Sequence, residues 1–212
     1  MTASPDNKAD STKATEPQWF AMRVFNNRIL RIKEELEQKG ARTYMAMKTV
    51  QTPGPKTTAQ PTTKPTTGTT TQPTKTVKKL QLAPSLLFVR TTPDALKDFK
   101  QDHFSELMIY RRADSTDPAP IPEEQMRMFI LVTSATDGRD VDLVSETLMG
   151  PDTRQFDFKP GEKVRVTEGP FKGAEGVIKR IKKDRKLLVA VQGVVVVAIS
   201  NIPARFLERI QN

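Results

Sequence analysis

His103, the only histidine of the 212-residue chain, lies among carboxylates, a combination that general acid–base catalysis uses. Asp94, Asp98 and Asp102 precede it at the i,i+4 spacing of a helix, and Glu106 follows it. A catalytic triad or a histidine metal site would need further partners, and the chain has no cysteine to supply a thiolate. We therefore interpret these acids as the solvated face of a surface helix.

A glycine-rich stretch near the carboxy terminus is the other candidate for chemistry. Its pattern, Gly169-x-x-x-Gly173-x-x-Gly176, lacks the Gly-Lys-Ser/Thr ending with which a phosphate loop binds nucleotides. The sequence thus predicts a protein that is not an enzyme and that has no cofactor and no metal.

Positive charge is concentrated in three parts of the chain. The net charge of +9 divides into +3 over residues 1–52, +5 over 53–80, −5 over 81–160 and +6 over 161–212. We therefore expect contacts with a polyanion from the two amino-terminal segments and from the carboxy-terminal one.

No segment has the composition of a targeting or membrane sequence. Residues 1–16 are polar and lack the apolar stretch of a signal peptide, so we expect a disordered tail and a cytoplasmic protein. The longest apolar run, 194–199, is too short to cross a bilayer and predicts a buried strand, so no membrane contact is expected.

The patterns before residue 136 alternate between strand and helix. Such an order predicts an α+β sandwich of a small sheet and three helices. We expect strands at 18–25, 44–47, 86–90 and 107–110, and helices that begin near Asn27, after Thr92 and after Pro122.

A threonine- and proline-rich stretch interrupts this order. The two residue types supply 17 of the 25 residues at 52–76, with three lysines and no acid. Such a composition buries little and predicts a disordered segment, either a domain linker or an insertion in a hairpin. Strands are predicted on both sides of it, which favours the insertion.

The last fifty residues predict a small all-β barrel. Four short strands are expected at 163–168, 176–182, 186–192 and 194–200, with turns rich in Gly, Pro, Asp and Lys. The expected domains are a sandwich over 17–136, a linker over 137–158 and a barrel over 159–212.

Motifs in both domains resemble the NusG family of transcription elongation factors. Three stretches resemble its KOW motif: 160–166, 169–173 and 176–178. Three others resemble the opening strand, the polymerase-facing strand and the Pro-x-Pro segment of its NGN domain: 19–23, 82–89 and 118–123. The resemblance implies an NGN-type sandwich followed by a KOW (SH3-like) barrel.

Within the family, the chain resembles UpxY-type NusG paralogues, which act on capsule and surface-polysaccharide operons. This likeness is carried by residues 21–24, 122–126 and 191–198. Housekeeping NusG has Ile-Phe-Gly in its last hairpin, and that phenylalanine helps to bind termination factor Rho or a ribosomal protein. Gln192-Gly193 stands there in this chain, so neither partner is expected.

By resemblance, the amino-terminal domain presents an apolar groove to the clamp helices of RNA polymerase. Ser85 and Leu86 stand where the family has glycine and tyrosine, so a contact there would be aliphatic. The alternative is that these apolar residues are ordinary core, as Trp19 is expected to be. The candidate polymerase-binding residues are Phe20, Leu82, Ala83, Pro84 and Leu86.

Two basic groups are candidates for nucleic-acid binding. Arg23, Arg28 and Arg31 lie on or beside the first helix, where the family approaches the non-template DNA strand. The alternative is a solvated helix face balanced by nearby acids. The second group lies on one barrel hairpin and would bind RNA or a partner, or keep the hairpin soluble: Lys179, Arg180, Lys182, Lys183 and Arg185.

The barrel carries two candidate partner-binding residues, Phe171 as an exposed anchor and Gln192. The leading hypothesis is a monomeric factor that binds RNA polymerase and promotes processive elongation and antitermination at particular operons. It would act through non-template DNA or nascent RNA, with the KOW domain recruiting an unknown partner. The alternatives are a ribosome-associated KOW protein that binds RNA and a general NusG that couples transcription to translation.

Overall fold

A four-stranded antiparallel sheet forms the centre of the amino-terminal half. The computed structural model describes residues 16–52, 76–112, 115–144, 163–181 and 184–210. The strand order is β2-β5-β1-β6, and the bounds are β1 (Gln18–Val24), β2 (Arg42–Tyr44), β5 (Leu86–Thr91) and β6 (Leu107–Ile109). The expectation of a small antiparallel sheet with three helices is confirmed.

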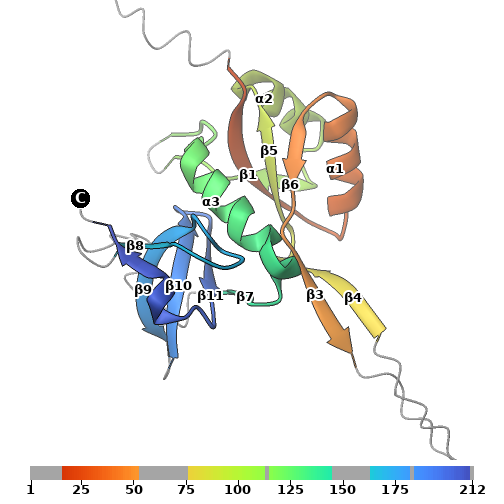
Figure 1. Cartoon of the computed structure of the whole chain (residues 1–212). Helices are drawn as coiled ribbons and strands as arrows, with labels where there is room; N and C mark the ends of the chain where they lie inside the picture. The colour runs from red at the N-terminus through yellow and green to blue at the C-terminus, as the bar shows by residue number, and fades with distance from the viewer. Residues whose placement is uncertain (1–15, 53–75, 113–114, 145–162, 182–183, 211–212) are drawn as a thin grey trace, which may run out of the picture.

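Two helices, α1 (Ile29–Gln38) and α2 (Pro93–Asp102), cover one face of this sheet (Figure 1). Thr92 caps α2 by accepting a hydrogen bond from the backbone N–H of Ala95 (3.3 Å), as its sequence pattern predicts. The apolar residues of both helices join one buried cluster with alternate residues of β1 and β5, including Ile32, Leu36, Leu96, Phe99, Met22 and Leu87.

The two ends of α1 differ in how well the sequence predicts them. Asn27, near which the helix is predicted to begin, is not its N-cap: its backbone is left-handed (φ 55°), and the following residue takes the cap position without a side-chain hydrogen bond. Gly40, a residue type that commonly takes the left-handed position after a helix, ends α1 with φ 82°. Its N–H donates to the carbonyl of Glu37 (3.0 Å), and that of Ala41 donates to Leu36 (3.0 Å), which makes a Schellman cap.

Helix α3 (Glu123–Ser134) lies between the sheet and the carboxy-terminal domain (Figure 1). On the sheet side, the ring centroid of Phe129 is 5.1 Å from that of Phe88 and 6.2 Å from that of Tyr44. On the other side, α3 packs on strand β10 (Asp184–Val191). A helix with apolar residues on two sides is typical of one covered on two sides.

The carboxy-terminal domain is a six-stranded antiparallel sheet with the order β12-β8-β9-β10-β11-β7. Strand β11 (Val195–Ile199) is buried throughout, as the apolar run predicts. The remaining strands are β7 (Val141–Leu143), β8 (Lys163–Val166), β9 (Glu175–Ile181) and β12 (Leu207–Arg209), and the 3-10 turn η3 (Ala204–Phe206) precedes β12.

The predicted linker at 137–158 contains structure that the sequence analysis missed. The 3-10 turn η1 (Ala135–Gly138) follows α3, and β7 then pairs with β11 as an edge strand of the carboxy-terminal sheet. Residues 145–162, the rest of the predicted linker, lie outside the described residues. Three residues with one polar and two apolar side chains give too weak an alternation for a strand to be predicted.

Strands β3 (Met47–Thr52) and β4 (Thr76–Gln81) form a separate two-stranded ribbon (Figure 1). The pairing runs from Met47 opposite Gln81 to Thr52 opposite Thr76. Thr52 and Thr76, expected to be ends of the disordered insertion, are therefore strand residues. The remainder of the insertion, 53–75, and residues 1–15 of the expected tail lie outside the described residues.

Candidate functional site

The residues predicted to face the polymerase at 82–86 form a tight loop between the ribbon and β5. The N–H of Leu82 donates to the carbonyl of Ala46 (2.9 Å), and that of Leu86 donates to Ala83 (3.3 Å). Leu82, Ala83 and Leu86 are buried in the apolar cluster that also contains α3, whereas Pro84 is exposed. The buried side chains thus anchor the loop to the core, and its proline is exposed to solvent.

Ser85 occupies the position where the resemblance places a glycine, and its backbone explains that preference. Its φ is 66°, in the left-handed region that costs a residue with a side chain about 1–2 kcal/mol. Its carbonyl accepts a hydrogen bond from Val24 (2.8 Å), which fixes the turn. Because glycine loses more unfolded-state entropy, Ser85→Gly is expected to raise the free energy of unfolding by only about 0.5–1 kcal/mol.

Chemical denaturation followed by the fluorescence of Trp19 measures this change. Gly40→Ala is the reverse control, because Gly40 has φ 82° and open space around its Cα. That substitution is expected to lower the free energy of unfolding by about 1 kcal/mol. A destabilised Ser85→Gly variant would contradict the strain argument.

Phe20 does not share this surface. It is 1% exposed and belongs to the cluster beneath α1 and α2, whereas Leu86 belongs to the cluster on the α3 side. Successive side chains of a strand point to opposite faces, so the side chains of Phe20 and its neighbour Trp19 lie on opposite faces of the sheet. The expected groove containing both Phe20 and Leu86 is therefore wrong, while Trp19 is core as predicted and its Nε1 donates to Glu123 (3.4 Å).

Two residues extend the loop surface across the sheet. Arg23 of β1 pairs with Leu86 of β5 on one side and with Met108 of β6 on the other, which places the three on one face. Arg23 is exposed and Met108 is 44% exposed. We call Pro84, Leu86, Arg23 and Met108 the loop-end row. Sequence reasoning missed Met108, although its place between the buried Leu107 and Ile109 is the signal that could have identified it.

Arg28 and Arg31, the other two candidates near α1, converge on a single carboxylate. Both donate to the carboxylate of Glu106. His103 also contacts this carboxylate (Nδ1 to Oε2, 3.3 Å), and its Nε2 lies 2.9 Å from the carboxylate of Glu35. Burial alone would raise the pKa of Glu106, but the hydrogen bonds from Arg31 and His103 and the positive charges beside it lower that pKa overall. His103 is thus part of an ion-pair network that ties α1 to the end of α2.

An exposed aromatic side chain stands next to this network. Phe104 is 79% exposed, and Lys100 Nζ lies 5.0 Å from its ring centroid. Phe25 is also exposed, and its backbone N–H donates to the carbonyl of Glu106 (2.8 Å). Exposed rings beside cations are the combination on which unpaired bases stack, and the sequence analysis did not single these rings out.

The basic hairpin of the carboxy-terminal domain places like charges opposite each other. Lys179 pairs with Lys186, and Arg180 pairs with Arg185, between β9 and β10. Like charges directly opposite are unfavourable, but Lys186 also lies 3.8 Å from Asp142. A polyanion bound beside Lys179 would reduce the repulsion that remains between the two lysines. Lys182 and Lys183 lie outside the described residues.

Phe171 and Gln192, the expected partner-binding residues, have different surroundings. Phe171 is 5% exposed and packs in the apolar cluster, so its expected role as an exposed anchor is wrong. The bend between Gly169 and Gly173 turns its ring inward: both glycines have positive φ, and Gly173 N–H donates to Val166 (2.8 Å). Glycines on both sides of the ring do not reveal from sequence which way it points.

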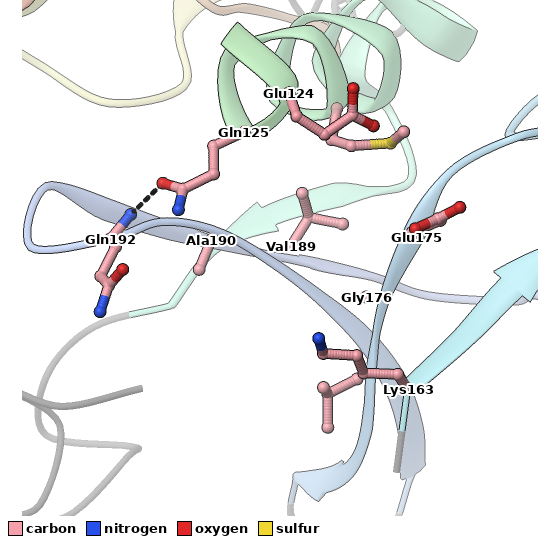
Figure 2. Close-up of a pocket in the computed structure, with 10 residues that line it drawn as sticks. Glu124, Gln125, Lys163, Glu175, Gly176, Val189, Ala190 and Gln192 are labelled. Atoms are coloured by element: carbon pink, nitrogen blue, oxygen red, sulfur yellow. Dashed lines mark hydrogen bonds between the residues drawn. The ribbon is translucent and has the colours of Figure 1, made fainter. Parts of the chain in front are cut away.

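Gln192 takes part in the contact between the two domains. Its backbone N–H donates to Oε1 of Gln125 on α3 (3.0 Å), as Figure 2 shows. A cavity of about 240 Å³ lies beside this hydrogen bond, lined by α3 residues including Met128 and by sheet residues including Lys163, Glu175 and Val189. The domains therefore meet at an interface with an apolar part and a polar edge.

The described residues contain neither a metal-binding cluster nor a membrane-spanning helix. Among the described residues, no group of three or more His, Asp or Glu side chains could hold a metal ion. No helix in the described ranges is both long and apolar enough to span a bilayer.

Comparison with known families identifies both domains. Residues 17–130 match the model described as "Transcription termination factor nusG", and residues 160–197 match the KOW motif. A comparison with curated proteins found no match. The first match alone covers more than half of the chain. The chain therefore belongs to the NusG family, whose members are transcription elongation factors rather than enzymes and bind RNA polymerase.

Proposed function

We propose that this NusG-family protein binds the clamp helices of RNA polymerase through the loop-end row and promotes processive elongation and antitermination. Its targets would be particular operons of the surface-polysaccharide type, as the likeness to UpxY-type paralogues implies. The KOW domain would recruit a further partner, and Gln192 in place of the family's phenylalanine argues against Rho and against a ribosomal protein.

The observation that carries this proposal is an exposed apolar rim above a buried loop. Pro84 and Met108 are exposed, while Leu82, Ala83 and Leu86 beneath them are anchored in the α3 cluster. A recognition surface gains affinity when its anchors are held rigidly before binding. Both rim residues are exposed while the KOW domain packs on α3.

The same row suggests how nucleic acid would lie relative to the polymerase. Arg23 is exposed between Leu86 and Met108. Its guanidinium would contact a phosphate of the non-template strand at the edge of the polymerase contact. Arg28 and Arg31 would contribute only to the extent that a phosphate competes with Glu106 for them.

Co-purification of the full-length protein with core RNA polymerase tests the proposal. A Pro84→Glu/Met108→Glu variant is expected to bind roughly 10-fold more weakly or worse, because it introduces two charges into an apolar contact. Both positions are exposed, so the fold should tolerate the changes. Retention can be measured by titrating tagged polymerase against each protein.

Leu30→Glu is the matched control. Leu30 is 60% exposed but lies on α1, on the other face of the sheet from the loop-end row. It should leave polymerase binding unchanged. Equal retention of wild type and the double variant would remove the loop-end row from the interface, and no retention of the wild type would favour the ribosome-associated alternative.

A further inference from the structure

The β3–β4 ribbon is the strongest unassigned surface of the molecule. It is separate from both larger sheets and projects away from the body of the protein (Figure 1). Its described positive residues are Lys48, Lys78 and Lys79, and no acidic residue occurs anywhere from Met47 to Gln81. Val77, Lys78, Lys79 and Leu80 are all exposed, so neither face of β4 is covered.

The root of the ribbon is fixed to the rest of the fold. Lys48 Nζ pairs with Asp142 (2.6 Å) and donates to the carbonyl of Val141 (3.2 Å), both in β7. Gly138 has φ 68° and packs so closely that an added Cβ would lie 2.5 Å from the carbonyl oxygen of Met47. The ribbon is therefore a rigidly mounted element and not a loose hairpin.

The side chains of Lys78 and Lys79 have no hydrogen bond or ion pair with the described residues, in contrast to the side chain of Lys48. They are neighbours on one strand, so their side chains leave the ribbon on opposite faces. Each carries a charge on a long flexible stem that can reach a phosphate several ångströms away. The ribbon thus offers unpaired positive charge in both directions.

We propose that the β3–β4 ribbon binds duplex DNA. The major groove of B-form DNA is about 12 Å wide and admits a two-stranded ribbon with phosphates on both sides, which suits lysines that diverge. The major groove of an RNA duplex is too deep and narrow to admit it. A single strand is bound mainly by aromatic stacking, and neither β3 nor β4 contains an aromatic residue.

This contact goes beyond the proposed function, because it requires neither RNA polymerase nor the loop-end row. The ribbon contacts α3 and η1 through β3, and Lys48 joins it to β7, which belongs to the sheet of the KOW domain. DNA bound to the ribbon would therefore lie beside both domains. Its contribution is positional and electrostatic, and base sequence is not read by phosphate contacts of this kind.

Binding of the full-length protein to a 20-base-pair DNA duplex, measured over a range of salt concentrations without polymerase, tests the proposal. In Lys78→Gln/Lys79→Gln, the slope of log affinity against log salt is expected to fall by roughly 2, since each lost phosphate contact removes roughly 0.9. Affinity near 0.15 M salt should fall by roughly 10-fold or more.

The control is Lys39→Gln/Lys97→Gln, which removes the same charge from α1 and α2. These lysines are paired with Asp102 and Asp117, away from the ribbon. An unchanged slope in this control and a reduced slope in the ribbon variant support the proposal. The proposal would be overturned if the two variants had the same slope. It would also be overturned if the ribbon variant lost as much affinity for an RNA duplex of the same length as for the DNA duplex. Because polymerase is absent, failure here leaves the polymerase-binding result unaffected.

Discussion

Replacing Gly176 with alanine is expected to unfold the KOW domain while the NGN domain stays folded. Gly176 lies in β9 between β8 and β10, and an added Cβ would overlap the carbonyl oxygen of Leu188 and lie 3.1 Å from Leu187 Cδ1. Backbone cannot move aside as a flexible side chain can, so we expect a cost of about 3 kcal/mol. The free energy of unfolding of a domain of some fifty residues is rarely more than a few kcal/mol.

Amide hydrogen exchange and NMR dispersion of residues 163–210 should report this loss. Fluorescence of Trp19, the single tryptophan, should report an unchanged NGN domain. Gly193→Ala is the control within the same domain: φ is 73° but nothing lies within 4 Å, so only left-handed strain of about 1 kcal/mol is expected. If Gly193→Ala destabilised the KOW domain more than Gly176→Ala, the close approach of β10 would not explain why glycine is needed at position 176.

The KOW glycines show how far sequence reasoning reaches. The sequence predicts turns rich in glycine between the strands of the barrel. Gly169 and Gly173 lie in such a turn, each with φ above 80°. Gly176 has no such conformation and is needed because β10 passes too close for a side chain. Spacing identified the motif, but only the packing of three strands separates the two physical reasons.

Element types were predictable because local chemistry and periodicity specify them. Thr92 with Pro93 specified the start of α2, and the apolar run specified β11. Which face of an element meets which neighbour depends on register, which the sequence does not give. Phe20 therefore ended on the face opposite Leu86, and Phe171 turned inward.

Helix α3 is the clearest case of a missed second face. One apolar side of the helix carries Phe129 and meets the sheet. Met128, one position earlier, instead lines the cavity against the KOW domain. Periodicity assumes one partner for a helix, and a helix between two domains has two. The interdomain contact was for this reason not predictable from the pattern.

Phe129→Ala is expected to lower the free energy of unfolding of the NGN domain by about 3–5 kcal/mol. The side chain is fully buried, and its ring contacts Phe88 at 5.1 Å and meets Tyr44 edge-on at 6.2 Å and 84°. Tyr44 also shares a hydrogen bond with Thr133 one turn along α3 (2.6 Å), so a cavity at 129 loosens the attachment of the helix to the sheet. Urea denaturation followed by Trp19 fluorescence measures the loss.

Met128→Ala on the same helix separates the two faces. Met128 borders a cavity of about 240 Å³, so its removal deletes fewer close contacts and should cost the NGN domain less than about 2 kcal/mol. Its effect should appear at the domain contact, as a shift of the Gln192 amide that donates to Gln125. If both variants lowered the free energy of unfolding, followed by Trp19 fluorescence, by the same amount, the two faces of α3 would not pack separately on the sheet and on the KOW domain. A large loss for Phe129→Ala with a moved Gln192 amide for Met128→Ala would establish α3 as the element that joins them.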